Sequence, residues 1–157
     1  MSGDTATLAL FLGRLERLNE SLVTDVCKRH GVSPSEFRVL AMLRHGSGER
    51  PVSPSTIAHW VVQTSGGLTA TLGRLEADGR VNRVADPDDG RGRLVVLTEA
   101  GSSFHDELFD DLVERYALVL GDIDGREASE MIRTLIGAFE RFSNLRPSTG
   151  WDIGAVA

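Results

Sequence analysis

The spacing of apolar side chains predicts a chain built mainly of amphipathic helices. Between residues 5 and 29 the leucines and valines recur every three or four positions and so share one helical face. The same period returns in five later segments, which are residues 34–43, 56–62, 65–77, 99–120 and 125–143. Two of these begin at Ser33-Pro34 and Ser53-Pro54, where a capping serine precedes the proline. The pattern therefore predicts six helices.

Two short segments break this helical period and predict a β-hairpin. Residues 81–85 and 94–97 are rich in valine and leucine, and the stretch between them, Asp86-Pro87-Asp88-Asp89-Gly90, consists of turn-forming residues. The order is then helix, helix, short helix, capped helix, hairpin. That order is typical of a winged helix-turn-helix, in which the capped helix, here 65–77 with Ser65 as its N-cap, enters the major groove of DNA. The fold class is mainly α with a small β-hairpin wing.

Composition excludes several other classes of protein. A length of 157 residues with 41% hydrophobic content suits one compact domain, and a single cysteine, Cys27, rules out an internal disulfide framework. The four histidines are scattered without metal or triad spacing, so we expect no metal, no cofactor and no catalysis. No leader pattern and no apolar run of about 18 residues is seen, so we expect a cytoplasmic protein with no membrane partner.

The formal net charge of -6 is unusual for a nucleic-acid binder, because lysines and arginines normally neutralise phosphates. Residues 63–98 hold five arginines against five acids, so this segment is neutral and the rest of the chain carries the negative charge. The charge pattern is compatible with a DNA-binding surface but is not evidence for one.

The residues of the capped helix and the hairpin resemble the signature of the MarR (multiple-antibiotic-resistance regulator) family. The resemblance is carried by Ser65-Gly66-Gly67-Leu68-Thr69 through Arg74-Leu75-Glu76, by Asp86-Pro87-Asp88-Asp89-Gly90-Arg91, and by Val95-Val96-Leu97-Thr98-Glu99-Ala100-Gly101. It extends over nearly the whole chain. It implies one domain over 1–157, with a winged helix-turn-helix at 33–98, dimerisation helices at 5–30 and 99–143, and an irregular tail at 144–157. It also implies a homodimer that binds a palindromic operator in duplex DNA.

The start of the capped helix supplies most of the candidate DNA contacts. Its free backbone N–H groups favour a phosphate, and Gly66 and Gly67 permit close approach. Ser65 and Thr69 add hydroxyl donors, although Ser65 acts equally well as a plain N-cap.

Two further positions on this helix leave alternatives open. Ala70 occupies a position where members of the resembled family often carry a base-reading side chain, so base reading here would depend on a thymine methyl or on neighbours. Arg74 could contact a DNA phosphate or pair with an acidic side chain of the same chain.

The resemblance places an arginine of the wing at the minor groove. Asp89-Gly90-Arg91 matches an Asp-x-Arg element of the family, and Arg91 is the strongest single candidate; an ion pair with Asp89 is its alternative role. Gly90 stands where many members carry a second arginine. Arg93 compensates for that loss, or the affinity is lower.

The resemblance also implies a repressor released by a small aromatic or anionic ligand that binds between the dimer helices and the DNA-binding lobe. Arg14 is the cation best placed for a carboxylate, and His30 and Trp60 would line the same cleft. Their alternative roles are an interface charge, a helix-terminal cation and a core aromatic residue.

Two other functions stay open at this point. One is a winged helix that contacts only proteins. The other is an oxidant sensor acting through Cys27, although Cys27 lies near the end of the first helix, whereas the sensing cysteine of relatives lies near its start. We expect an inert, half-buried thiol.

Overall fold

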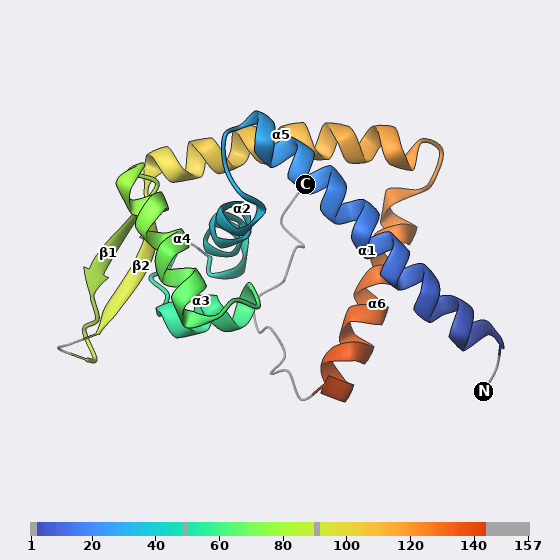
Figure 1. The fold of residues 1–157 in the computed structure, drawn as a ribbon, viewed down its shortest axis with the longest axis horizontal. Helices are drawn as coiled ribbons and strands as arrows, with labels where there is room; N and C mark the ends of the chain where they lie inside the picture. The colour runs from blue at the N-terminus through green and yellow to red at the C-terminus, as the bar shows by residue number, and fades with distance from the viewer. Residues whose placement is uncertain (1–2, 49, 90–91, 144–157) are drawn as a thin grey trace.

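The computed structural model describes residues 3–48, 50–89 and 92–143, which form six α-helices and one two-stranded hairpin (Figure 1). The elements are α1 (Gly3–Arg29), α2 (Pro34–Ala41), a π-helical turn η1 (Met42–Gly46), α3 (Pro54–Trp60), α4 (Ser65–Ala77), β1 (Val81–Ala85), β2 (Arg93–Leu97), α5 (Glu99–Leu120) and α6 (Gly125–Ser143). The predicted fold class is confirmed. None of the helices within these described ranges is long and apolar enough to span a membrane.

The winged-helix lobe runs from α2 to β2 around one apolar core. Its largest fully buried side chains are those of Leu40, Leu43, Ile57, Leu68, Leu72 and Leu75. The hairpin is antiparallel, with Val81 opposite Leu97 and Ala85 opposite Arg93. Val52, just before α3, adds a bridge to Val95 through N–O bonds of 3.0 and 2.8 Å, so the start of α3 is tied to the hairpin.

A second apolar cluster joins the lobe to the long helices. It lies where the end of α1 crosses α5 beside α2, and it contains Val26, Cys27, Phe37, Leu108 and Leu112. Cys27 is fully buried, which corrects the expectation of a half-buried thiol. The two clusters meet at Phe104, whose side chain packs against both.

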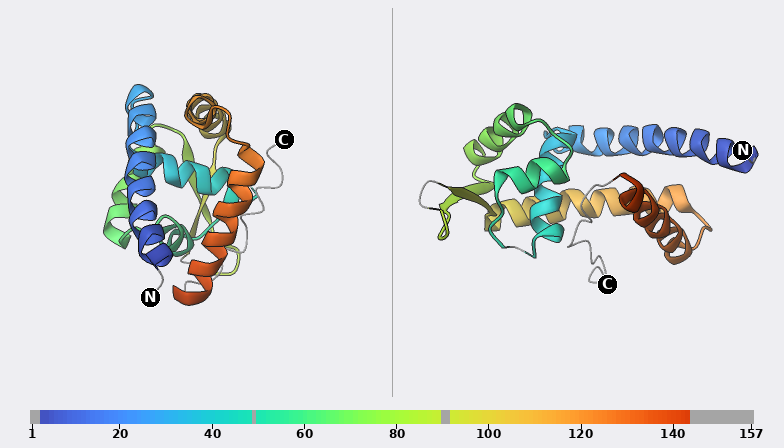
Figure 2. Two further views of the ribbon diagram at one scale, coloured as in Figure 1. Left: turned by 90° about the vertical axis from the view of Figure 1, so that its right-hand side faces the viewer. Right: turned by 90° about the horizontal axis from the view of Figure 1, so that it is seen from below.

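The first half of α1, the end of α5 and α6 extend away from the lobe (Figure 2). Their apolar side chains are exposed, including Leu10 at 74%, Leu118 at 80% and Met131 at 67%. No side chain described on α6 is buried. One protomer therefore leaves a broad apolar surface without cover.

The motif Leu97-Thr98-Glu99-Ala100-Gly101 forms the junction between the hairpin and α5. Thr98 caps α5 by accepting from the amide of Gly101 at 2.9 Å, and its hydroxyl donates to the carbonyl of Gly79 at 2.8 Å. A Cβ added at Gly101 would lie 2.0 Å from the carbonyl oxygen of Arg80. The glycine thus permits direct contact between the backbone before β1 and the first turn of α5, and this part of the signature is structural.

Three local expectations need correction. The helix expected at 56–62 is α3, Pro54–Trp60, so it begins directly after its cap Ser53 and ends before Val62. Ser65 is the first residue of α4 and not its N-cap; the cap is Thr64, whose Oγ1 accepts from the amide of Gly67 at 3.2 Å. Serine and threonine stand side by side and both suit a cap, so only the backbone geometry separates them. The helix expected to run to residue 43 ends instead at Ala41, and a π-helical turn follows it.

Candidate nucleic-acid interface

Helix α4 has a buried face and an exposed face of different chemistry. Leu68, Leu72 and Leu75 are at most 1% exposed and anchor the helix in the lobe core. The exposed residues of α4 up to Gly73 are short and uncharged, namely Ser65, Gly66, Gly67, Thr69, Ala70 and Gly73, and the exposed Arg74 and Glu76 follow near the end of the helix. A helix with such a face can approach a major groove closely along its first three turns.

The first turn of α4 leaves backbone donors available. In the described part of the chain, the amides of Ser65 and Gly66 have no hydrogen-bond acceptor, while the Gly67 amide is taken by the Thr64 cap. The Thr69 hydroxyl donates back to the Ser65 carbonyl at 2.8 Å, so its proton is already engaged. A phosphate at this helix end would be bound by the amides of Ser65 and Gly66.

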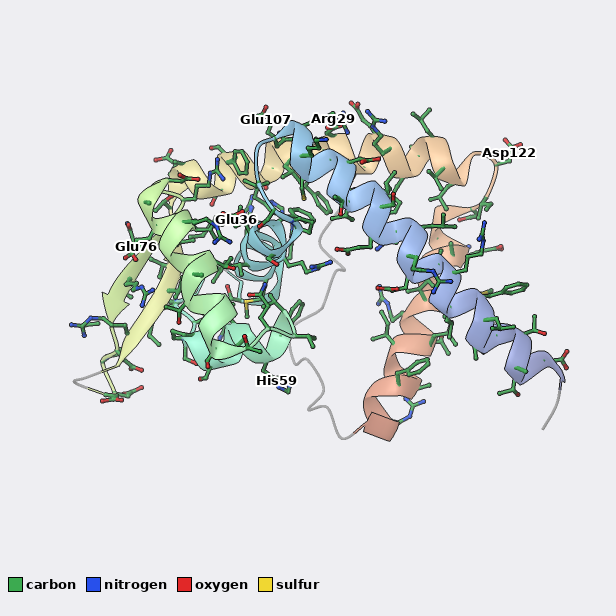
Figure 3. The ribbon with its side chains drawn as sticks, in the orientation of Figure 1. Arg29, Glu36, His59, Glu76, Glu107 and Asp122 are labelled. Atoms are coloured by element: carbon green, nitrogen blue, oxygen red, sulfur yellow. The ribbon has the colours of Figure 1, made fainter. Side chains whose placement is uncertain are left out.

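Arg74 is exposed, but its guanidinium is paired within the chain. Its Nε donates to Oε1 of Glu36 at 3.0 Å, and Figure 3 labels Glu36 beside α2, in whose first turn it lies. Glu36 Oε2 also accepts from the backbone amide of Ser33 at 2.8 Å, which completes the capping box of α2. Burial alone would raise the pKa of Glu36, but the hydrogen bonds from Ser33 and Arg74 outweigh it, so the pKa is lowered. Of the two roles left open for Arg74, the geometry favours pairing with an acid.

Two more arginines of the lobe pair with carboxylates. Arg80 lies 3.4 Å from Asp78 and Arg83 lies 3.2 Å from Glu76. Arg93 is exposed, and in the described part of the chain its guanidinium donates only to the carbonyl of Gly92, at 3.0 Å. Arg93 is thus the described arginine of residues 63–98 that stays available for an external anion.

The base of the wing is tightly folded. The amide of Asp86 donates to the Gly92 carbonyl at 3.2 Å, and the Gly92 amide donates to the Asp89 carbonyl at 2.8 Å. A Cβ at Gly92 would lie 2.9 Å from that of Asp86, so the close approach requires a glycine. Gly90 and Arg91, the predicted tip, lie outside the described residues.

The three candidate ligand residues lie on different elements, and Arg14 is far from His30 within one chain. Arg14 is exposed on α1. His30 follows the end of that helix, roughly 24 Å further along at about 1.5 Å per residue. His30 Nε2 lies 3.2 Å from Oδ2 of Asp111 on α5. Trp60 packs on the lobe core, with its ring next to Gly46.

Cys27 has none of the features of a reactive thiol. Burial raises its pKa to about 11, and the nearby Arg38 guanidinium only partly offsets this. A buried thiol with a raised pKa forms little thiolate, the species that oxidants attack.

Sequence reasoning missed three residues that shape the interface. Thr64 caps α4, Glu36 anchors Arg74 from 38 residues away, and Val62 sits in the turn before α4 with a positive φ of 52°. Thr64 carried a signal, because threonine suits a cap as well as serine does. Val62 was assigned to the end of the preceding helix, although the absence of glycine between residues 58 and 65 is a signal, since such turns often contain one.

Comparison with known proteins agrees with this geometry. The model of the MarR family matches residues 30–92. The HTH-type transcriptional regulator PecS of Dickeya dadantii is 28% identical over 83% of this chain and 78% of its own length. The homoprotocatechuate degradative operon repressor of Escherichia coli is 26% identical over 96% of this chain and 95% of its own. The crystal structure of NadR in complex with 4-hydroxyphenylacetate superposes with a TM-score of 0.72 at 20% identity, covering 84% and 91% of the two chains.

Proposed function

Because this chain belongs to the MarR family of winged-helix transcriptional regulators, which are not enzymes, we propose that it binds a palindromic operator in duplex DNA as a homodimer in the cytoplasm. Helix α4 would enter the major groove and the hairpin would lie against the neighbouring minor groove. The domain would comprise the winged helix-turn-helix at 33–98 and dimerisation helices at 5–30 and 99–143.

The observation that carries this proposal is the outward face of α4. Its residues 65, 66, 69, 70 and 73 are exposed, short and uncharged, while the arginine further along the helix is bound to Glu36. Direct contacts would come from the amides of Ser65 and Gly66, from the close approach allowed by Gly67, and from the Ala70 methyl group against a thymine methyl.

The flanking contacts would come from the wing. Arg93 has no carboxylate partner among the described residues, which suits a phosphate contact. Arg91 is proposed at the minor groove from its sequence motif. With so few cations available among the described residues of the lobe, we expect modest affinity.

Regulation by a small ligand is part of the proposal and rests on the relatives. One relative is named as the repressor of a homoprotocatechuate degradative operon, and one similar structure holds 4-hydroxyphenylacetate. We propose a repressor that an aromatic anion releases, with Arg14, His30 and Trp60 as candidate contacts supplied by different parts of the dimer. A thermal shift by 4-hydroxyphenylacetate, reversed on dilution, would support this step.

Selection of genomic DNA fragments by the purified protein tests the main proposal. Ala70→Glu places a carboxylate on the outward face of α4 and should abolish enrichment, because the charge would face phosphates. Ala100→Glu is the matched control, since it adds the same charge at an exposed position in the first turn of α5, where a negative charge is favourable. Arg91→Ala and Arg93→Ala should weaken enrichment without abolishing the fold.

Recovery of a palindromic site by the wild type and by Ala100→Glu, but not by Ala70→Glu, would establish DNA binding through α4. Absence of enrichment by the wild type at low salt would contradict the proposal and favour a winged helix used for protein contacts.

A further inference from the structure

Val62 has a backbone conformation that valine rarely adopts. Its φ is 52°, in the left-handed region, and it is the one non-glycine residue with positive φ in the described part of the chain. The other positive values belong to Gly31, Gly48, Gly79 and Gly121. In this region a branched Cβ crowds the following carbonyl, so valine strains the free protein where glycine would not.

The end of α3 imposes this conformation. The amide of Val61 donates to the Ile57 carbonyl at 2.9 Å, and the amide of Gln63 reaches back to the Ala58 carbonyl at 3.0 Å. The second bond is that of a Schellman motif, in which the residue between must be left-handed and is usually glycine. The turn geometry is therefore fixed by hydrogen bonds on both sides of Val62.

Packing inside the chain does not compensate for this strain. The side chain of Val62 packs on little, because the residue is 87% exposed, the highest value among the large hydrophobic residues of the described part. The adjacent Val61, by contrast, is 8% exposed and packs in the lobe core. A strained residue whose side chain lies in solvent points to a partner outside the chain.

The position of Val62 indicates which partner this is. It lies in the turn that leads into α4, two residues before the Thr64 cap. No charged residue occurs between His59 and Arg74, so this edge of the lobe offers an apolar contact and not an ionic one. Duplex DNA presents matching apolar groups in the thymine methyl of the major groove and in the deoxyribose of the backbone.

We propose that Val62 contacts duplex DNA beside the start of α4, packing its two methyl groups against a thymine methyl or a deoxyribose. The proposal rests on the proposed function. Burial of the side chain in the complex then offsets the strain that the free protein carries. Val62 would add to operator affinity through an apolar contact, in addition to the contacts of the basic and hydroxyl residues.

The test compares Val62→Gly with the wild type in thermal unfolding and in operator binding at one salt concentration. Glycine relieves the strain, so Tm should rise by about 2–4 °C. Loss of the apolar contact should weaken operator binding about tenfold. Val62→Asn, which tolerates the left-handed region but is polar, should behave in the same way, whereas Val62→Ile should keep wild-type affinity.

Gly79→Val is the matched control for strain. Gly79 has a φ of +70° at the far end of α4, and an added Cβ would meet no atom within 4 Å. Valine at this positive φ adds backbone strain without a steric clash. The Tm of Gly79→Val should therefore fall by about as much as the Tm of Val62→Gly rises, while operator affinity stays at the wild-type value.

Replacing operator thymines by uracil, one at a time, separates the two DNA groups. If one replacement weakens the wild type but not Val62→Gly, the contact is a thymine methyl; if none does, it is a deoxyribose. If Val62→Gly binds the operator as tightly as the wild type, or if its Tm falls, the inference about Val62 is overturned and the proposed function is not. Failure of the wild type to bind any DNA would overturn the proposed function as well.

Discussion

Arg74 on α4 and Glu36 on α2 form an ion pair with an Nε–Oε1 distance of 3.0 Å. The carboxylate side chain is only 9% exposed, whereas the guanidinium side chain is 54% exposed. Because Glu36 also completes the capping box with Ser33, one carboxylate fixes both the start of α2 and the last turn of the proposed recognition helix. The arginine in the family-like motif thus holds α4 in place within the lobe.

Arg74→Met should therefore cost about 1 kcal/mol of unfolding free energy and leave the salt dependence of operator binding unchanged. Methionine keeps part of the side-chain volume but removes the hydrogen bond to Glu36. Arg93→Ala is the comparison, because loss of one phosphate contact should reduce the slope of log affinity against log salt by about 0.9. A similar loss of slope in Arg74→Met would instead make Arg74 a phosphate contact.

Gly101→Ala should destabilise the protein severely. The added methyl would lie 2.0 Å from the Arg80 carbonyl oxygen, so α5 would have to move away from the hairpin. We expect a loss of more than about 3 kcal/mol in denaturant unfolding, or failure to fold. A loss below about 1 kcal/mol would show that this junction can shift easily.

The sequence predicts the order and type of the elements because both depend on local signals. Apolar spacing locates the six helices, and the turn residues from Asp86 to Gly90 locate the hairpin. The π-helical turn at Met42–Gly46 has no such local signal. The error in the α4 cap is of the same kind, because Thr64 and Ser65 differ only in backbone geometry.

The sequence predicts which face of α4 forms the candidate site, but it does not predict the ion pairs around that site. The outward face of α4 follows from the helical period, and Ser65, Thr69 and Ala70 are exposed on it. The partner of Arg74 is 38 residues distant and could be found only by folding α2 against α4. Likewise, the sequence gives no sign that Asp111 would engage His30.

Gly73→Ala should change stability and operator binding in opposite directions. Gly73 lies inside α4, and a Cβ there would meet no atom within 4 Å. Alanine should thus stabilise the helix by about 0.5–1 kcal/mol. If the outward face of α4 approaches DNA closely, the added methyl should weaken operator binding. Higher stability with unchanged affinity would show that the third turn of α4 stays clear of the groove.

Met131→Glu should disrupt the homodimer that we propose. Met131 is 67% exposed on the apolar face of α6, where a second copy would bury it, and a buried unpaired carboxylate is costly. Sedimentation velocity should show a smaller species than the wild type. Ser129→Glu, on the opposite face of α6, is the control and should keep the wild-type mass. A monomeric wild type would contradict the proposed assembly directly.

The stability of the protein should fall as the pH drops below about 6.5, because the buried His105 and the half-buried His45 disfavour protonation. The rings of His45 and His105 lie 4.8 Å apart, centroid to centroid, between η1 and α5. Burial lowers the pKa of both histidines. The positive charge of Arg44 also opposes protonation of each imidazole, although Asp106 favours it.

The folded state then binds fewer protons than the unfolded state just below pH 6.5, so the unfolding free energy decreases with falling pH. Asp106 does not explain a change in that range, because the hydrogen bond from Arg44 lowers its pKa to about 2 and its contribution is lost only at more acidic pH. Denaturant unfolding at pH 7.5, 6.5 and 5.5 measures the effect. His105→Gln, which cannot titrate, should flatten the dependence; an unchanged slope in that variant would assign it to other groups.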